Sequence, residues 1–334
     1  MNVMVLGSGG WGTALAMVLH SNGHRVTMWT YLEEECQHLL QYRGNEKLLP
    51  GVHIPEEIAI TTDMTLAAGQ DMVVMAVPSF AVSSTAEQLA KILDAGTIVV
   101  NVAKGLDSFH DYCRFSESID RALQGRNPIV ALTGPTHAEE VARGIPTTIL
   151  AASKDLEAAQ SVQDMFMSKR FRVYISPDIV GAELGGAFKN IIALAAGFLD
   201  GMGLGDNTKA ALMTRGLAEM VRLGVSLGAR KETFAGLSGI GDLIVTCTSM
   251  HSRNRRAGIL VGQGKTIKEA MKEVGAVVEG YYATKAGYML AQKMGVEMPI
   301  TTAMYQALYE GADPETLIQQ LMTRSKKAEF EELW

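Results

Sequence analysis

The sequence predicts an α/β protein: a doubly wound, mostly parallel sheet in the N-terminal part, followed by an all-helical C-terminal domain. Three observations support this prediction. Short apolar runs alternate with helical runs over residues 1–176, a glycine-rich segment directly follows the first apolar run, and no strand-like run appears beyond residue 177. Alternating strands and helices at this spacing are typical of a parallel sheet with helices on both faces. We therefore expect one domain at residues 1–176 and a second at residues 177–334.

The expected strands are short runs rich in apolar and β-branched residues. They cover residues 2–6, 25–29, 58–62, 72–77, 97–102, 129–132, 147–151 and 171–175. Helices are expected between them at residues 12–21, 79–93 and 156–167. The run 72–77 is apolar at every position, which indicates a strand covered on both faces.

The second domain is expected to begin at Ser176, Pro177 and Asp178. Ser176 can cap a helix, Pro177 suits its first turn, and Asp178 complements the helix dipole. Helical patterns then cover residues 177–200, 209–227, 266–273, 281–293, 301–309 and 314–324. The polar tail at residues 326–334 is expected to fray.

Composition and charge argue against several classes of protein. Hydrophobic residues make up 47% of the 334 residues and charged residues 20%, which suits a packed core and not a disordered chain. The net charge of −6 argues against nucleic acid or an anionic membrane surface as a partner, because these require a basic face. The apolar stretch 179–204 is interrupted by charged residues, so we expect a buried helix there and not a membrane span.

Cysteine and histidine usage predicts a cytoplasmic protein without a catalytic metal. The three cysteines lie far apart and form no C-x-x-C pair, which argues against disulfides and a zinc cage. The seven histidines show no paired helical spacing, so no metal-ligand set is expected. The chain opens on a strand-like run without a basic segment or a cleavage site, so no targeting segment is expected.

Residues 7–12 follow the pattern G-x-G-x-x-G between a predicted strand and a predicted helix. In this pattern Gly7 permits a tight turn, Gly9 lets the backbone approach a pyrophosphate, and Gly12 lets the helix pack closely on the strand. The helix N-terminus then faces the phosphate charge. The segment therefore predicts a Rossmann-type domain that binds a dinucleotide; a purely structural glycine turn is the alternative.

The end of the second strand commonly distinguishes NAD from NADP. An acidic residue there binds the ribose hydroxyls of NAD, and a nearby arginine accepts the extra phosphate of NADP. Here Thr30 and Tyr31 are neutral, and Glu33 comes late in the loop. The choice between NAD and NADP therefore stays open.

Lys189 lies in a predicted helix that is apolar around most of its circumference. Burial of an unpaired ammonium is costly and lowers the pKa of a lysine, which suits a group that exchanges a proton at neutral pH. Gly185 and Gly186 leave room beside it for a ligand or another backbone. The alternative is a structural lysine paired with a carboxylate such as Glu183. The dinucleotide domain favours catalysis, because hydride transfer to a carbonyl also requires a proton.

Two further candidates lie in the C-terminal half. Asp242, in a glycine-rich turn, either holds the Lys189 ammonium or caps the next helix. The run 252–256 offers a hydroxyl, an amide and guanidinium groups. That set suits a phosphate monoester, although a solvated basic face is the alternative.

Two candidates in the N-terminal half follow predicted strands. Lys104 and the segment 134–136 each come after a strand, at the sheet edge where open α/β folds bind ligands. Pro135 is expected to start a short helix. Thr136 with Glu139 also matches a capping box, which is the structural alternative for this segment.

Motifs in a fixed order along the chain resemble those of the bacterial NAD(P)-dependent sn-glycerol-3-phosphate dehydrogenase family. They are residues 7–14, 103–106, 134–136, 186–190, 214–219, 241–243, 252–255 and 277–280, and the resemblance runs from residue 2 to about residue 324. The resemblance implies reversible reduction of dihydroxyacetone phosphate to sn-glycerol 3-phosphate, a precursor of glycerophospholipids, with NAD or NADP as cofactor. It also implies a cytoplasmic enzyme, often a homodimer.

The resemblance further implies roles for individual residues. Together with Gly7, Gly9 and Gly12, the cofactor would be lined by Gly10, Trp11, Thr30, Tyr31, Lys104, Ala138, Arg253, Val277 and Glu279. The substrate would be held by Lys104, Gly134, Thr136, Lys189, Asp242, Ser252, Arg253 and Asn254. Lys189 would transfer the proton, beside the nicotinamide and assisted by Lys104 and Asp242. Gly10 departs from the Ser or Ala common in the family, and Thr30 and Tyr31 depart from its Arg, His or Asp.

Two other functions are compatible with parts of this pattern. A β-hydroxyacid dehydrogenase also combines a Rossmann domain with a helical domain that carries a lysine, but it acts on carboxylates. A non-catalytic dinucleotide sensor would need the glycine-rich segment but no buried lysine. The phosphate-suited run 252–256 argues against the first function, and Lys189 argues against the second.

Overall fold

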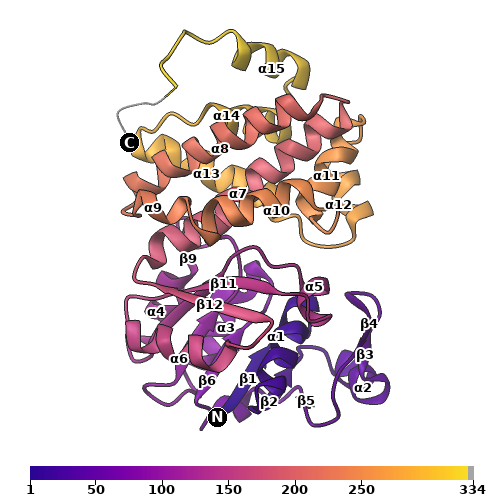
Figure 1. Ribbon diagram of the computed structural model, residues 1–334, viewed down its shortest axis with the longest axis vertical. Helices are drawn as coiled ribbons and strands as arrows, with labels where there is room; N and C mark the ends of the chain where they lie inside the picture. Colours follow the sequence, from indigo (N-terminus) through magenta and orange to yellow (C-terminus); the bar gives the residue numbers. More distant parts are fainter. Residues whose placement is uncertain (330–334) are drawn as a thin grey trace. The chain divides into compact units, whose positions relative to one another are not determined.

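A sheet of eight strands forms the centre of the N-terminal part of the computed structural model, which describes residues 1–329. The strand order is β12-β11-β10-β7-β6-β1-β2-β5 (Figure 1). The strands are β1 (Asn2–Leu6), β2 (Arg25–Trp29), β5 (Ala59–Thr61), β6 (Met72–Met75), β7 (Ile98–Asn101), β10 (Ile129–Thr133), β11 (Thr147–Ala152) and β12 (Phe171–Ser176). Neighbouring strands are parallel except β10 and β11, which are antiparallel. The predicted mostly parallel sheet is confirmed.

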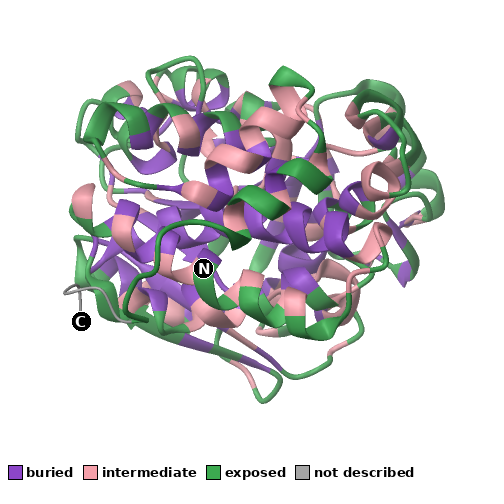
Figure 2. Cartoon of the chain, turned by 90° about the horizontal axis from the view of Figure 1, so that it is seen from above, coloured by how far each residue is buried: buried purple, intermediate pink, exposed green. Residues whose placement is uncertain are grey.

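Helices cover both faces of this sheet, because successive residues of a strand point to opposite sides. The adjacent residues Val5 and Leu6 of β1 belong to two different buried clusters. Helices α1 (Gly10–Ser21) and α6 (Leu156–Phe166) contribute to the first cluster, and α3 (Val82–Leu89) and α4 (Phe115–Leu123) to the second. Figure 2 shows the buried residues on the inner sides of the elements. The sheet is therefore doubly wound, as predicted.

Several short elements of the N-terminal part could not be recognised from the sequence. They are α2 (Glu33–Tyr42), the hairpin of β3 (Gly44–Asn45) and β4 (Leu49–His53), the hairpin of β8 (Leu106–Asp107) and β9 (Cys113–Arg114), and the 3-10 turn Met64–Ala67. The helix expected at 79–93 is a 3-10 turn, Ser79–Ala81, followed by α3, and the short helix expected from Pro135 is α5 (Ala138–Ala142). A strand of two residues is too short to show an alternating pattern. Helix α2 begins with three glutamates and has few buried residues, so its apolar face is narrow.

Helices alone form the regular structure of residues 177–329, as the sequence predicts. They are α7 (Ile179–Gly201), α8 (Asp206–Ser226), α9 (Lys231–Phe234), α10 (Asp242–Thr248), α11 (Arg253–Gly262), α12 (Ile267–Val274), α13 (Glu279–Met294), α14 (Pro299–Tyr305) and α15 (Pro314–Met322), with π-helical segments at Leu237–Gly241 and Gln306–Glu310. The sequence did not reveal α9 and α10, which are short, or α11, whose first four residues are polar.

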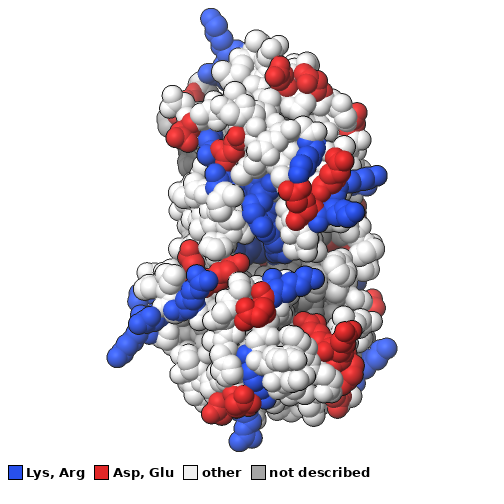
Figure 3. All heavy atoms as spheres, turned by 90° about the vertical axis from the view of Figure 1, so that its right-hand side faces the viewer, with Lys and Arg blue, Asp and Glu red and all other residues white. Residues whose placement is uncertain are grey.

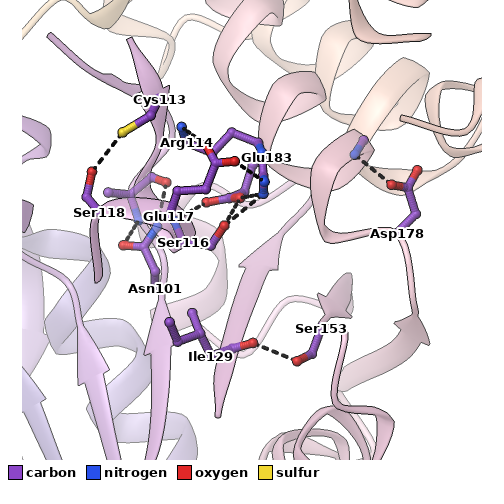
Figure 4. Close-up of polar contacts among 12 residues, drawn as sticks. Asn101, Cys113, Arg114, Ser116, Glu117, Ser118, Ile129, Ser153, Asp178 and Glu183 are labelled. Carbon is purple, nitrogen blue, oxygen red and sulfur yellow. Dashed lines mark hydrogen bonds and ion pairs between the residues drawn. The ribbon is translucent and has the colours of Figure 1, made fainter. Parts of the chain in front are cut away.

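The start of α7 differs from the prediction. Ser176 is the last residue of β12 and does not cap the helix; its hydroxyl accepts a hydrogen bond from the backbone N–H of Asp178, at 3.1 Å. The cap is Asp178, whose carboxylate accepts from the N–H of Gly181, at 2.9 Å (Figure 4). Pro177 precedes this cap and lies outside the first turn, because β12 continues one residue further than expected.

Helix α7 is long and apolar enough to cross a membrane by length and composition, but 94% of its most apolar window is buried inside the protein. The predicted buried helix is therefore confirmed. The chain divides into two compact units within this helix, Met1–Glu183 and Leu184–Trp334. The boundary predicted at residues 176 and 177 stays a prediction. Of the tail predicted to fray, residues 326–329 lie outside any helix and residues 330–334 lie outside the described residues.

Candidate functional site

The glycine-rich turn after β1 has an open position at its centre. Gly7 has a φ of +118°, a conformation that favours glycine, and a Cβ there would lie 2.5 Å from the carbonyl oxygen of Ala76. A Cβ at Gly12 would collide with the carbonyl oxygen of Gly7. At Gly9, by contrast, a Cβ would meet nothing within 4 Å.

This turn fits the pyrophosphate of a dinucleotide. Gly9 is the N-cap of α1 and makes no side-chain cap bond, so the first N–H groups of this helix have neither an intrahelical partner nor a capping side chain. Such N–H groups and the helix dipole favour a phosphate. The backbone around Gly9 is the cradle that the group requires, while Gly7 and Gly12 shape the turn.

Three residues predicted to line the cofactor lie together, Gly10 and Trp11 within the turn and Ala138 beside it. A Cβ at Gly10 would lie 3.6 Å from the Cβ of Ala138, the first residue of α5. The indole Nε1 of Trp11 is buried and has no hydrogen-bond partner among the described residues. The structure therefore brings Gly10, Trp11 and Ala138 together at the start of α1.

Lys104 and the segment 134–136 also lie together, as predicted. The Lys104 ammonium donates to the carbonyl oxygen of Gly134, at 2.8 Å, and to the Thr136 hydroxyl, at 3.4 Å. Gly134 has a φ of +149°, which turns the chain directly after β10. Both positions follow the carboxyl ends of parallel strands, where open α/β sheets bind ligands.

Thr136 is not the N-cap of α5, so the capping box that was its structural alternative does not form. Helix α5 begins at Ala138, and its N-cap is His137, which makes no side-chain cap bond. The Thr136 hydroxyl instead donates to the carbonyl oxygen of Gly134, at 3.1 Å. Pro135 therefore does not start the helix; it belongs to the turn that brings Thr136 to Lys104.

Lys189 is 5% exposed and lies in α7, within the C-terminal unit. Its ammonium donates to Asp242 Oδ1 and to the Thr246 hydroxyl, both at 2.6 Å. Asp242 and Thr246 lie one turn apart on α10, so one face of that helix holds the ammonium. The pairing of Lys189 with Asp242, left open by the sequence, is present.

A glycine on α7 lets the segment that carries Asp242 approach. A Cβ at Gly185 would collide with the carbonyl oxygen of Ser238, in the π-helical segment Leu237–Gly241. That segment leads directly into Asp242. The room beside Gly185 is therefore filled by another backbone, one of the two occupants that the sequence allows.

Glu183, the alternative partner of Lys189, belongs to a different ion pair. Its carboxylate accepts from Arg114 Nη1, at 2.8 Å, and from the backbone N–H and the hydroxyl of Ser116, at 2.8 and 2.5 Å (Figure 4). Burial raises the pKa of Glu183, and the Arg114 guanidinium opposes that rise. Glu183 therefore holds the start of α4 and not the lysine.

The run 252–256 separates into residues with different surroundings. The Ser252 hydroxyl caps α11 by accepting from the N–H of Arg255, at 3.2 Å. Arg255 donates to Asp200, at 2.8 Å, while Arg253 and Arg256 are exposed. On the face drawn in Figure 3, basic and acidic side chains are interspersed. Arg253 keeps the guanidinium that a phosphate would need, and Arg255 is committed to an internal ion pair.

Asn254 connects Lys189 to the segment 277–280. It is buried, donates through Nδ2 to Asn190 Oδ1 at 2.8 Å, and accepts at Oδ1 from the N–H of Gly280, also at 2.8 Å. Asn190 adjoins Lys189, and Gly280 adjoins Glu279 at the start of α13. The predicted residues Asn254, Val277 and Glu279 are thus tied to α7 within one unit.

Comparison with known proteins identifies the family of this chain. Residues 2–159 match the N-terminus, and residues 178–319 the C-terminus, of NAD-dependent glycerol-3-phosphate dehydrogenase. The chain belongs to this family.

Relatives cover nearly the whole chain. A glycerol-3-phosphate dehydrogenase [NAD(P)+] of Thermoanaerobacter sp. (strain X514) is 53% identical over 99% of both chains. That of Desulfitobacterium hafniense (strain Y51) is 50% identical over 99% of this chain and 94% of its own. The crystal structure of glycerol-3-phosphate dehydrogenase from Coxiella burnetii has a TM-score of 0.92, at 38% identity, and covers 97% of this chain and 99% of its own. The family is one of oxidoreductases that use NAD or NADP.

Two acidic groups, the half-buried Glu35 and the buried Glu219, escaped the sequence-based prediction. Glu35, on α2, accepts from the hydroxyls of Ser8 and Thr30, both at 2.8 Å. Glu219, on α8, accepts from the N–H groups of Ile300 and Thr301, at 2.6 and 3.1 Å. Glu219 lies in the motif 214–219, which carries the resemblance without indicating a role; for Glu35 the signal was an acidic residue shortly after the second strand.

Proposed function

We propose that this chain catalyses the reversible reduction of dihydroxyacetone phosphate to sn-glycerol 3-phosphate with NADH or NADPH. The observation that carries the proposal is the buried ammonium of Lys189, held by Asp242 and Thr246. A ketone becomes an alcohol by gaining a hydride at carbon and a proton at oxygen. The bound nicotinamide cofactor supplies the hydride, and this chain must supply the proton.

Lys189 is the proton donor in this proposal. As the carbonyl oxygen gains negative charge, the ammonium stabilises it and transfers a proton to it. Asp242 and Thr246 fix the position of Nζ, so that little reorganisation is needed when the charge develops. In the reverse direction the same nitrogen accepts the proton of the alcohol.

Other residues bind and orient the substrate and the cofactor. Arg253, with Ser252 and Asn254, would bind the phosphate, because a guanidinium donates two parallel hydrogen bonds to it. Lys104 would add a second positive charge, and Asp242 would accept from a substrate hydroxyl. Orientation of this kind can remove several kcal/mol from the barrier.

The cofactor would be held by the glycine-rich turn. The open position at Gly9 and the free N–H groups of α1 receive the pyrophosphate. Trp11, Thr30, Tyr31 and Ala138 would line the rest of the dinucleotide in the N-terminal unit. Arg253, Val277 and Glu279 are proposed as further cofactor contacts.

The cellular setting is part of the same proposal. All three cysteines are free, which suits the reducing cytoplasm. We expect the product to serve glycerophospholipid synthesis and the enzyme to be a homodimer, as in the family that the sequence resembles. Sedimentation of the purified protein at micromolar concentration tests the dimer.

A direct assay tests the proposed reaction. Purified protein is mixed with dihydroxyacetone phosphate and either NADH or NADPH, and loss of the absorbance of the reduced cofactor is followed. We expect turnover with this phosphorylated ketone and none with small β-keto acids. Turnover of a carboxylate substrate alone would instead indicate a β-hydroxyacid dehydrogenase, and dinucleotide binding without any turnover would indicate a sensor.

A further inference from the structure

The carboxylate of Glu35 lies where the glycine-rich turn meets the end of β2. The N–H of Gly7 donates to the carbonyl oxygen of Trp29, at 2.9 Å, so the two segments are adjacent. Glu35 Oε1 accepts from the Ser8 hydroxyl and Oε2 accepts from the Thr30 hydroxyl, each at 2.8 Å. Both carboxylate oxygens thus accept a hydrogen bond from a hydroxyl.

Lysine and arginine are absent from the segment of sequence that carries Glu35. Residues 30–42 contain no lysine or arginine, and the first turn of α2 carries Glu33, Glu34 and Glu35. Thr30 is buried and Tyr31 is 79% exposed. The formal charges that residues 30–42 add at pH 7 are therefore all negative.

NAD and NADP differ at this place. In a Rossmann-type domain the adenosine ribose lies between the glycine-rich turn and the end of the second strand, and NADP carries an additional phosphate on that ribose. A phosphate monoester has a charge near −2 at neutral pH and requires an arginine or lysine. A fixed carboxylate instead repels it and accepts hydrogen bonds from ribose hydroxyls.

We propose that Glu35 is the residue that selects NADH over NADPH in this chain. The inference rests on the proposed placement of the dinucleotide at the glycine-rich turn. Ser8 and Thr30 hold the carboxylate in place, so its charge is fixed at the ribose position before the cofactor arrives. Thr30 and Tyr31 did not decide between NAD and NADP in the sequence. Here Thr30 supports the Glu35 carboxylate, and Tyr31 is an uncharged neighbour.

The test measures affinity directly, by titrating purified protein with NADH and with NADPH and following the fluorescence of the bound nucleotide. Unmodified protein is expected to bind NADH at least about tenfold more tightly than NADPH. Glu35→Gln keeps the size of the side chain and removes its charge, so it should narrow that preference by about tenfold. The same ratio is then measured in kcat/KM with dihydroxyacetone phosphate.

Glu34→Gln is the matched control. Glu34 is the exposed neighbour on the same helix turn, so this change alters the net charge equally without touching Ser8 or Thr30. It should leave the ratio of the two affinities unchanged. A second variant, Tyr31→Arg, adds a guanidinium at an exposed position and leaves the hydrogen bonds of Glu35 intact; it should increase NADPH affinity by about tenfold.

Three outcomes overturn the inference: equal or tighter binding of NADPH by the unmodified protein, the same preference in Glu35→Gln as in Glu34→Gln, or no gain of NADPH affinity in Tyr31→Arg. Gly9→Ala separates this failure from failure of the cofactor site itself. If Gly9→Ala weakens both nucleotides while Glu35→Gln leaves their ratio unchanged, the site stands and the role of Glu35 is wrong. If Gly9→Ala weakens neither, the placement of the cofactor is wrong.

Discussion

The glycine-rich turn and the Lys189 site are built in opposite ways. The turn of residues 7–12 works through side chains that are missing, since the open position at Gly9 and the free N–H groups of α1 are backbone features. The site in α7 works through a charged side chain that is buried, with Asp242 and Thr246 as its partners. Substitutions in the glycine-rich turn should therefore change the affinity for the dinucleotide, whereas substitutions at the Lys189 site should change the rate of reduction.

The largest expected effect is on the rate of reduction by Lys189→Met. We expect kcat to fall by about 10²–10⁴, because the proton donor is lost, while the affinity for NADH changes little. Lys285→Met, on the exposed side of α13, is the matched control and should retain full activity. Nucleotide titration and steady-state kinetics measure the two quantities.

Lys189→Met also leaves the carboxylate of Asp242 buried without its ammonium, which destabilises a protein by several kcal/mol. Thermal unfolding is therefore measured beside activity, and the double variant with Asp242→Asn removes the unpaired charge. If the folded double variant reduces dihydroxyacetone phosphate at a rate near that of the unmodified enzyme, the Lys189 site does not carry out the chemical step, and its contrast with the glycine-rich turn is wrong.

Glu219 is a second buried ionisable group in the C-terminal unit. Its titration should change the free energy of unfolding and leave catalysis unchanged. Burial raises the pKa of Glu219 to about 7, although the N–H groups of Ile300 and Thr301 oppose that rise. The folded state therefore holds this proton more tightly than the unfolded chain does. The stabilisation is fully present below about pH 4.5 and is lost as the pH rises through 7, about 3 kcal/mol in all.

Glu219→Gln removes this titration. Urea unfolding between pH 4 and pH 8 should show a smaller loss of unfolding free energy with rising pH in Glu219→Gln than in the unmodified protein. Parallel pH profiles for the two proteins would mean that Glu219 does not titrate in this range.

The two ends of the glycine-rich turn should respond differently to the same substitution. A methyl group at Gly12 collides with the carbonyl oxygen of Gly7, so Gly12→Ala should lower the free energy of unfolding by about 1–3 kcal/mol. At Gly9 the methyl group meets nothing and φ is −64°, so stability should be unchanged or up to about 1 kcal/mol higher. Gly9→Ala should nevertheless weaken dinucleotide binding by about tenfold, since the methyl group intrudes on the pyrophosphate.

Urea unfolding and nucleotide titration of both alanine variants check this difference. Destabilisation by Gly9→Ala comparable with that by Gly12→Ala would show that the open position at Gly9 is structural.

The smallest expected effect concerns Arg253. Arg253→Ala should raise the KM for dihydroxyacetone phosphate by about tenfold with a smaller change in kcat, because the exposed guanidinium is proposed to bind the phosphate, remote from the reacting carbon. Arg256→Ala, the exposed neighbour, is the control. Equal KM values for the two variants would mean that Arg253 does not bind the phosphate and that the run 252–256 is a solvated basic face.

The sequence predicts those features that depend on residues close together in the chain. The strands of the sheet and the shape of the glycine-rich turn depend on neighbouring residues, and both were predicted. Burial of Lys189 was also visible, as a charge within an apolar helix. Short hairpins and the helices α9 and α10 were missed because their few residues show no periodic pattern, and α11 was missed because its first four residues are polar.

Partners of buried charges are set by tertiary packing, which the sequence does not display. Glu183 was as close a candidate as Asp242 for Lys189, yet residues six apart on one helix do not face each other. Asp242 reaches the lysine only because Gly185 admits the backbone of Ser238. Glu35 was overlooked for the same reason, since its contacts with Ser8 and Thr30 join three separate segments.

Chemical rescue of Lys189→Ala measures the proton-donor role most directly. The rate of dihydroxyacetone phosphate reduction is followed while a small alkylamine such as propylamine is added, with the unmodified enzyme and Lys285→Ala in parallel. We expect a rate near zero without amine and a saturable rise as the amine occupies the vacated space. A Lys189→Ala enzyme that reduces the ketone at nearly the unmodified rate in the absence of amine would contradict it.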